Sequence, residues 1–211
     1  MGGPWLSGAR VAEPFVAGTL KLIVGLGNPG AEYERTRHNA GYWFVDELLR
    51  RHGGAWRRES RHQSALARAA VDGVELWLQK PLTFMNASGA AVASVARFHR
   101  IEPAAILVVH DEIDLPPGAA RLKQGGGHGG HNGLRDVIAH LGPDFWRLRL
   151  GVGHPGSKDE VIDYVLERPA AAERPLIDAA LARALDVIPE LVRDGTQKAM
   201  QTLHTRDDNK G

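Results

Sequence analysis

The stretch that decides the fold spans residues 20–41 and reads LKLIVGLGNPGAEYERTRHNAG. Its apolar run over residues 20–24 ends at a glycine, which predicts a buried strand. A glycine-rich turn carrying Asn28 follows, and a polar loop then leads to His38, just before a predicted helix over residues 39–52. An imidazole held between a strand end and a helix start is a candidate proton acceptor near neutral pH, because its ordinary pKa is about 6.5.

The rest of the chain alternates between strand and helix patterns, which predicts an α/β fold. Asp72–Gly73 between two alternating segments predicts a hairpin, whereas other strands are joined through helices, so we expect a mixed sheet. The expected strands are 20–24, 64–71, 74–79, 106–109, 119–123 and 146–152. The expected helices are 39–52, one from Asn86 or Ser88 to Phe98, one from Asn132 to Leu141, 158–166, 171–194 with a break or kink at Pro175 or Pro189, and 196–203. The predicted fold is a single domain in which a twisted mixed (parallel and antiparallel) β-sheet is flanked by α-helices.

The 211 residues are enough for one large domain, which we expect to span residues 20–205. Residues 1–19 are rich in glycine and proline without periodicity and are predicted to be a flexible N-terminal extension, and residues 206–211 a frayed tail. No apolar run near the start is long enough for a signal peptide or a membrane span. The chain has no cysteine, which excludes disulfides, thiolate nucleophiles and cysteine-ligated zinc.

The formal net charge is only +1, so any contact with nucleic acid requires local concentrations of positive charge. A patch of this kind is more often an ordinary solvated surface. Three candidate patches are Arg57, Arg58, Arg61 and His62; Arg121 and Lys123; and Lys198, His204, Arg206 and Lys210.

Two cofactor-based interpretations compete with a hydrolytic one. Gly25-x-Gly27-x-x-Gly30 imitates a dinucleotide-binding motif, but a polar loop with Pro29 follows the strand where an apolar helix should start. His128-x-x-His131 is a close histidine pair to which His110 and Asp111 could add metal ligands, but it lies on a glycine loop. Neither pattern is complete, and no nucleophilic serine elbow or phosphate-binding loop is present.

The side chains that remain suit the attack of water on a carbonyl group. A neutral imidazole can take a proton from water, a carboxylate behind it fixes its tautomer, and amides can donate hydrogen bonds to an oxyanion. Asn28, Asn86 and Asp111 all follow predicted strand ends, where sites form in such sheets. We therefore expect a site composed of His38, Asp111, Asn28, Asn86 and Asn132, although the asparagines also suit turns and helix caps.

At these residues the chain closely resembles the bacterial peptidyl-tRNA hydrolases. The resemblance covers about residues 20–205. Its motifs are KLIVGLGNPGAEYERTRHNAG (21–41), KPLTFMNASG (80–89), HDEIDLPPG (110–118), GGGHGGHNG (125–133) and RLRLGVGHPG (147–156). It implies an enzyme that hydrolyses the ester between a peptide and the terminal ribose of a tRNA, a carboxylic-ester hydrolase.

The resemblance also implies roles for individual residues. His38 would be the general base and Asp111 its orienting partner. Asn28 and Asn86 would hold the substrate near the scissile bond, and Asn86 would also position the water or the oxyanion. The other implied contacts are His131 and Asn132 to the peptide or the tRNA end, Tyr33 and Met85 lining the cleft, and Arg121, Lys123 and Arg149 to tRNA phosphates. Arg121 stands where the family often has lysine, which keeps the charge but alters its geometry.

The implied partner is peptidyl-tRNA, and the implied enzyme is a cytoplasmic monomer that uses no metal, no organic cofactor and no membrane. The rival interpretation is an RNA-binding module without catalysis, which would use the same basic residues. Release of free peptide from the RNA distinguishes the two, because a binding module leaves the ester intact.

Overall fold

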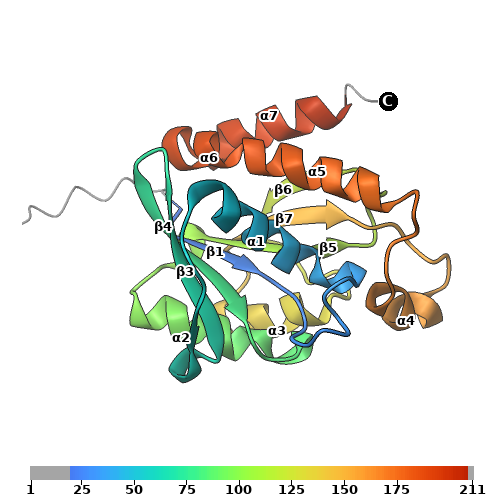
Figure 1. Cartoon of the computed structure of the whole chain (residues 1–211), viewed down its shortest axis with the longest axis horizontal. Helices are drawn as coiled ribbons and strands as arrows, with labels where there is room; N and C mark the ends of the chain where they lie inside the picture. Colours follow the sequence, from blue (N-terminus) through green and yellow to red (C-terminus); the bar gives the residue numbers. More distant parts are fainter. Residues whose placement is uncertain (1–19, 209–211) are drawn as a thin grey trace, which may run out of the picture.

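The computed structural model describes residues 20–208, and within them one seven-stranded sheet runs through the molecule in the order β2-β3-β4-β1-β5-β7-β6 (Figure 1). The strands are β1 (Leu22–Gly25), β2 (Arg57–Glu59), β3 (Ser64–Val71), β4 (Val74–Pro81), β5 (Ile106–Glu112), β6 (Ala120–Gln124) and β7 (Trp146–Gly151). Four neighbouring strands, β4, β1, β5 and β7, are parallel, whereas β2–β3, β3–β4 and β6–β7 pair antiparallel. The predicted mixed sheet is confirmed.

Helices cover both faces of the sheet (Figure 1). One apolar core joins the sheet to α1, α5, α6 and α7, and a second joins its other face to α2 and α3. The helices are α1 (Ala40–His52), α2 (Ser88–Phe98), α3 (Asn132–Leu141), α4 (Val161–Leu166), α5 (Arg174–Asp186), α6 (Ile188–Asp194) and α7 (Thr196–Asp208). None of these helices is both long and apolar enough to cross a membrane.

The glycines of the first strand allow α1 to lie directly on the sheet. A β-carbon on Gly25 would collide with the backbone of Gly41, and one on Gly41 would collide with the backbone of Leu26 and Val109. After Gly30 the chain forms a turn over residues 31–35 rather than a helix. Of the glycines that imitate a dinucleotide motif, Gly25 and Gly27 therefore serve the packing of α1 on β1, whereas Gly30 adopts a positive φ at the turn. This packing brings the start of α1 next to the ends of β1 and β5.

Several local predictions differ from the structure. Asn86 and Ser88 do not cap α2, because the N-cap is Ala87 and no side chain bonds there. Asn132 does not cap α3 either; the His131 ring accepts the bond from the Leu134 amide instead. The helix predicted over 171–194, with a break or kink at Pro175 or Pro189, is two helices, α5 and α6, and the break comes just before Pro189. Pro175 does not break a helix, because it lies in the first turn of α5, where its missing N–H costs nothing.

At the carboxyl end, helical structure extends beyond the predicted domain. Helix α7 continues to Asp208, three residues into the segment predicted as a frayed tail. Residues 1–19, predicted as a flexible extension, lie outside the described residues, as do residues 209–211. Strand β2, which comprises three exposed residues at the sheet edge, was not predicted.

Candidate active site

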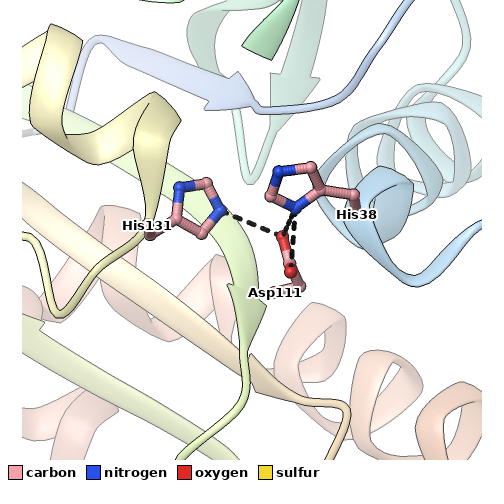
Figure 2. A group of neighbouring side chains, drawn as sticks. All are labelled: His38, Asp111 and His131. Carbon is pink, nitrogen blue, oxygen red and sulfur yellow. Dashed lines mark hydrogen bonds and ion pairs between the residues drawn. The ribbon is translucent and has the colours of Figure 1, made fainter. Parts of the chain in front are cut away.

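Three side chains from different parts of the chain meet at the carboxyl ends of the parallel strands (Figure 2). Asp111 near the end of β5 is 2% exposed, and its carboxylate oxygens lie 2.9 and 3.0 Å from Nδ1 of His38. Nε2 of His131 lies 3.0 Å from the same carboxylate. His38 lies in the 3-10 turn that precedes α1, and His131 precedes α3. A buried carboxylate therefore receives two imidazole groups from opposite sides.

The hydrogen bonds fix which nitrogen of each ring carries the proton. Because a carboxylate accepts, Nδ1 of His38 and Nε2 of His131 are the donors. The other nitrogen of His131 accepts from the Leu134 amide at 3.2 Å, so both of its nitrogens are engaged. Nε2 of His38 is turned away from Asp111 (Figure 2). Of these two rings, it is His38 that keeps a lone pair for another proton.

The electrostatics of the site follow from burial and these contacts. Burial lowers the pKa of His38, but the charge of Asp111 and its hydrogen bond outweigh burial and leave the pKa above 6.5. Burial raises the pKa of Asp111, but the charges of His38 and His131 and their hydrogen bonds hold it well below its ordinary range. Asp111 is therefore ionised at neutral pH and favours proton uptake by His38.

A third histidine, His110, immediately precedes Asp111 in β5. Its Nδ1 donates to the main-chain oxygen of Asp111 at 2.7 Å, and its ring packs edge-on against His131 at 4.9 Å. Burial, together with the charge of His131, lowers the pKa of His110 to about 3. His110 is therefore neutral at physiological pH and supports its neighbours rather than exchanging protons with them.

Asn28 is held in one orientation by the surrounding backbone. Its main-chain N–H and C=O bond the side chain of Asn39 at 2.8 and 2.9 Å. Its own Oδ1 accepts from the Met85 amide at 2.7 Å. Because the amide N–H is a donor, the oxygen of the Asn28 side chain must face it, and the NH₂ group points the other way. The sequence predicted Asn28 at the site, but Asn39, which positions it, was not singled out.

A cleft of about 850 Å³ opens beside these residues and brings together the predicted substrate-contacting set. Asn86 is an exposed residue on this cleft, and the side-chain oxygen of Asn132 accepts from Arg135, which leaves its NH₂ group as a donor. The predicted residues that line the cleft are Asn28, Tyr33, His38, Met85, Asn86, Asp111, His131 and Asn132.

One side of the cleft is apolar, and sequence reasoning missed it. Helix α4 contributes Ile162 and Leu166, and Phe84 comes from the segment after β4. Ile162 is 64% exposed and Phe84 60% exposed, which is high for large apolar side chains. The pairs Val161–Ile162 and Val165–Leu166 give α4 more apolar residues than one buried face needs, which is the only sequence signal for this surface.

Arg37, adjacent to His38, holds α4 in place beside the site. Its guanidinium donates to the main-chain oxygen of Tyr164 at 3.0 Å and to Glu173 at 2.7 Å, and it stacks on the Tyr164 ring at 3.9 Å. Its main-chain N–H donates to Glu167. Arg37 is buried, so it couples the position of the apolar side of the cleft to the segment that carries His38.

The three predicted phosphate contacts lie outside the cleft. Arg121 and Lys123 are on β6, and Arg121 is directly opposite Arg149 on β7. Arg149 donates from Nε to Glu112 at 2.8 Å, and Glu112 lines the cleft. The β6–β7 edge thus carries three basic residues beside the strand that holds Asp111, and Arg149 is paired with Glu112.

A metal ion would have one plausible location among the described residues. The ligand atoms of His38, Asp111 and His131 lie within 4.8 Å of one another. His128, the other half of the predicted histidine pair, is not in this group, and its Nδ1 accepts from the Gly130 amide. The nitrogens of His38 and His131 that face Asp111 act as donors, so a metal would have to displace those protons.

The family model for peptidyl-tRNA hydrolase matches residues 22–210. Peptidyl-tRNA hydrolase from Halorhodospira halophila is 56% identical over 188 residues, covering 89% of this chain and 97% of that protein. The corresponding protein from Edwardsiella ictaluri is 56% identical over 188 residues, covering 88% and 96%. The crystal structure of peptidyl-tRNA hydrolase from Acinetobacter baumannii superposes with a TM-score of 0.86 at 47% identity, covering 87% of this chain and 94% of that one. The chain therefore belongs to the peptidyl-tRNA hydrolase family.

Proposed function

We propose that this protein hydrolyses the ester bond that joins a peptide to tRNA, with His38 as the general base. Family membership supports the reaction. The observation that supports the role of His38 is its hydrogen-bond pattern: Nδ1 donates to ionised Asp111, and Nε2, in a ring that lines the cleft, has no partner within residues 20–208. A neutral imidazole in that state accepts a proton from water as the water attacks.

In the proposed reaction, the water oxygen bonds to the ester carbonyl carbon while its proton moves to Nε2 of His38. Asp111 stabilises the imidazolium that forms. The bond between the carbonyl carbon and the ribose oxygen then breaks, and the ribose oxygen takes up the proton from His38. The products are a tRNA with its terminal hydroxyl restored and a free peptide, whose new carboxyl group releases the second water proton to solvent and becomes a carboxylate.

The NH₂ groups of Asn28, Asn86 and Asn132 are candidates to hold the carbonyl oxygen or the adjoining main chain. A neutral amide donor stabilises developing negative charge without attracting a second anion. Asn28 is the strongest candidate among them. Its side-chain oxygen already accepts from the Met85 amide, so the orientation of its NH₂ group is fixed before substrate binds.

The rest of the cleft suits a substrate whose peptide varies. Exposed Phe84, Ile162 and Leu166 offer apolar contact without a pocket for one particular side chain. Arg121, Lys123 and Arg149 would bind backbone phosphates of the tRNA, and contacts of that kind do not depend on sequence.

The test is deacylation of N-acetylaminoacyl-tRNA in EDTA by the purified protein, with His38→Ala and, as its matched control, His52→Ala at the partly exposed end of α1. We expect free tRNA and free peptide from the wild type and from His52→Ala. We expect a rate at least about 10²-fold lower from His38→Ala, with similar tRNA affinity. Loss of wild-type activity in EDTA would favour a metal-dependent site, and full activity of His38→Ala would remove His38 from its proposed role.

A further inference from the structure

A second hollow, of about 640 Å³, lies at the β2–β3 edge of the sheet, on the face that carries α2. None of the residues that line it also lines the catalytic cleft. β2 and β3 are at the opposite edge of the sheet from β6 and β7 (Figure 1). Its lining combines arginines with aromatic rings, namely Arg57, Arg61, Arg68, Trp77, Phe98 and His99.

The strand register explains why these side chains meet. Arg68 is directly opposite Trp77 across β3 and β4, and Arg57 is opposite Leu66 across β2 and β3. Cross-strand partners point to the same face of a sheet, so both pairs project toward α2. Helix α2 ends at Phe98 and is capped by His99, and these two rings complete the hollow.

The aromatic rings form a contiguous cluster that remains partly open to solvent. Trp77 and His99 lie 4.3 Å apart with 30° between their planes, and His99 meets Phe98 edge-on at 4.9 Å. Phe98 is 54% exposed, although no function of the catalytic cleft requires an apolar ring there. Burial and the neighbouring charges of His62 and Arg68 lower the pKa of His99, so its ring is neutral and suited to stacking.

The charge of the hollow is positive. Arg68 stacks on Trp77 at 4.4 Å and pairs with Glu75 at 2.6 Å, which neutralises it. Arg61 stacks on Phe98 at 4.8 Å. Within residues 20–208, neither Arg57 nor Arg61 forms an ion pair, and Glu59 is the one acidic residue in the lining. Arg57 and Arg61 are therefore available to an anion next to the exposed ring of Phe98.

We propose that this hollow binds a nucleotide of single-stranded RNA, with the base stacked on the exposed ring of Phe98, beside His99 and Trp77, and the phosphate held by Arg57 and Arg61. Stacking platforms flanked by cations are how proteins hold unpaired bases, whereas an acidic peptide would use the arginines but not the ring faces. The proposal does not rest on the hydrolytic reaction, because it requires RNA contact only at a surface remote from the cleft.

The probe is hexa-adenylate RNA, titrated into the full-length protein while the indole N–H signal of Trp77 is followed by NMR. The signal is assigned with Trp77→Phe. We expect it to shift on binding, and we expect the affinity measured by that shift to fall about fivefold or more in Phe98→Ala. In Arg57→Ala/Arg61→Ala, the slope of log affinity against log salt should decrease by about 1.4.

Arg50→Ala is the charge control, because Arg50 is an exposed residue of α1, on the other face of the sheet. It should bind like the wild type. The four altered side chains in the hollow are partly or largely exposed, and circular dichroism verifies that each variant is folded. Unchanged affinity in both Phe98→Ala and the double arginine variant would overturn the proposal. So would a hexaglutamate peptide that shifts the Trp77 signal as strongly as the RNA does, since that would indicate an acidic protein partner.

Discussion

Asp111 contacts two histidines, and the second nitrogen of each ring decides what that ring can do. In His131 it accepts the amide of Leu134 and so caps α3. In His38 it has no partner among the described residues, and the ring lines the cleft. The two rings therefore have different chemistry despite sharing one carboxylate. His131 adds a second donor that keeps Asp111 ionised, and His38 retains the capacity to accept a proton.

Replacing Asn28 with aspartate tests whether its NH₂ group acts on the reacting carbonyl. The substitution keeps the oxygen that accepts from the Met85 amide at 2.7 Å, so the fold should be retained. It removes the donor and adds a negative charge near the developing oxyanion. We expect kcat to fall about 10²- to 10³-fold with a smaller change in KM. Single-turnover deacylation measures this, and a wild-type rate in Asn28→Asp would show that Asn28 only supports the loop.

Single side chains were predictable from the sequence where a strand end fixes them. Asn28 follows β1 and Asp111 lies near the end of β5, and adjacent parallel strands bring their carboxyl ends together. The contact between His131 and Asp111 was not predictable in the same way. It depends on the glycine loop before α3, which Arg147 holds through the main-chain oxygens of Gly126 and Gly127. No local pattern encodes a bond between segments that far apart.

Among the secondary-structure elements, α4 is short and depends on Arg37 for its position. We expect Arg37→Lys to lose stability, because an ammonium cannot reproduce the paired bonds to Tyr164 and Glu173. The expected cost is about 2 kcal/mol of unfolding free energy. KM for peptidyl-tRNA should also rise, since α4 carries Ile162 and Leu166. Urea unfolding and steady-state kinetics measure the two effects.

The matched control for that experiment is Arg174→Lys, which alters an exposed pair with Asp178 on α5. Exposed pairs of this kind contribute little, so its stability should change by less than about 0.5 kcal/mol. If Arg37→Lys behaves like Arg174→Lys in both measurements, then Arg37 does not hold α4 against the site.

Elements were predictable where the signal was local. Asp72–Gly73 indicated the β3–β4 hairpin, and the structure has that turn with Asp72 and Gly73 at positive φ. Pro189 marked the break between α5 and α6. β2 had no such signal, because its three residues are all exposed and it exists by pairing with β3. Helix caps were also unpredictable, because asparagine and serine, the residue types at Asn86, Ser88 and Asn132, suit turns as well as they suit N-cap positions.

For the molecule as a whole, positive charge near the cleft is concentrated at the β6–β7 edge. Lys123 is the most direct test of this edge, because it is exposed, whereas Arg149 is already paired with Glu112. If Lys123 contacts a tRNA phosphate, Lys123→Ala should decrease the slope of log tRNA affinity against log salt by about 0.9. Lys198→Ala is the control, as Lys198 pairs with Asp194 at 2.7 Å. Equal slopes in both variants would exclude Lys123 as a phosphate contact.

The sheet class could be predicted from the order of hairpins and crossovers, but its strand order could not. The order β2-β3-β4-β1-β5-β7-β6 places β1 between β4 and β5, which depends on how helices pack on both faces. The cleft also belongs to this scale. Its polar side comes from strand ends that the sequence indicated, whereas its apolar side comes from α4, which reaches the site only through the long-range contacts of Arg37.

The most direct test of His38 as general base is the pH dependence of single-turnover deacylation in the wild type and in Asp111→Asn. The reactive form of His38 is neutral, and Asp111 raises its pKa, so the wild-type rate should fall as pH decreases through a midpoint above 6.5. Asparagine removes the charge but not the burial that lowers the pKa. The midpoint should therefore shift to lower pH in Asp111→Asn, with a reduced plateau rate. An identical midpoint in the two proteins, or a wild-type rate that does not change with pH in this range, would contradict the account.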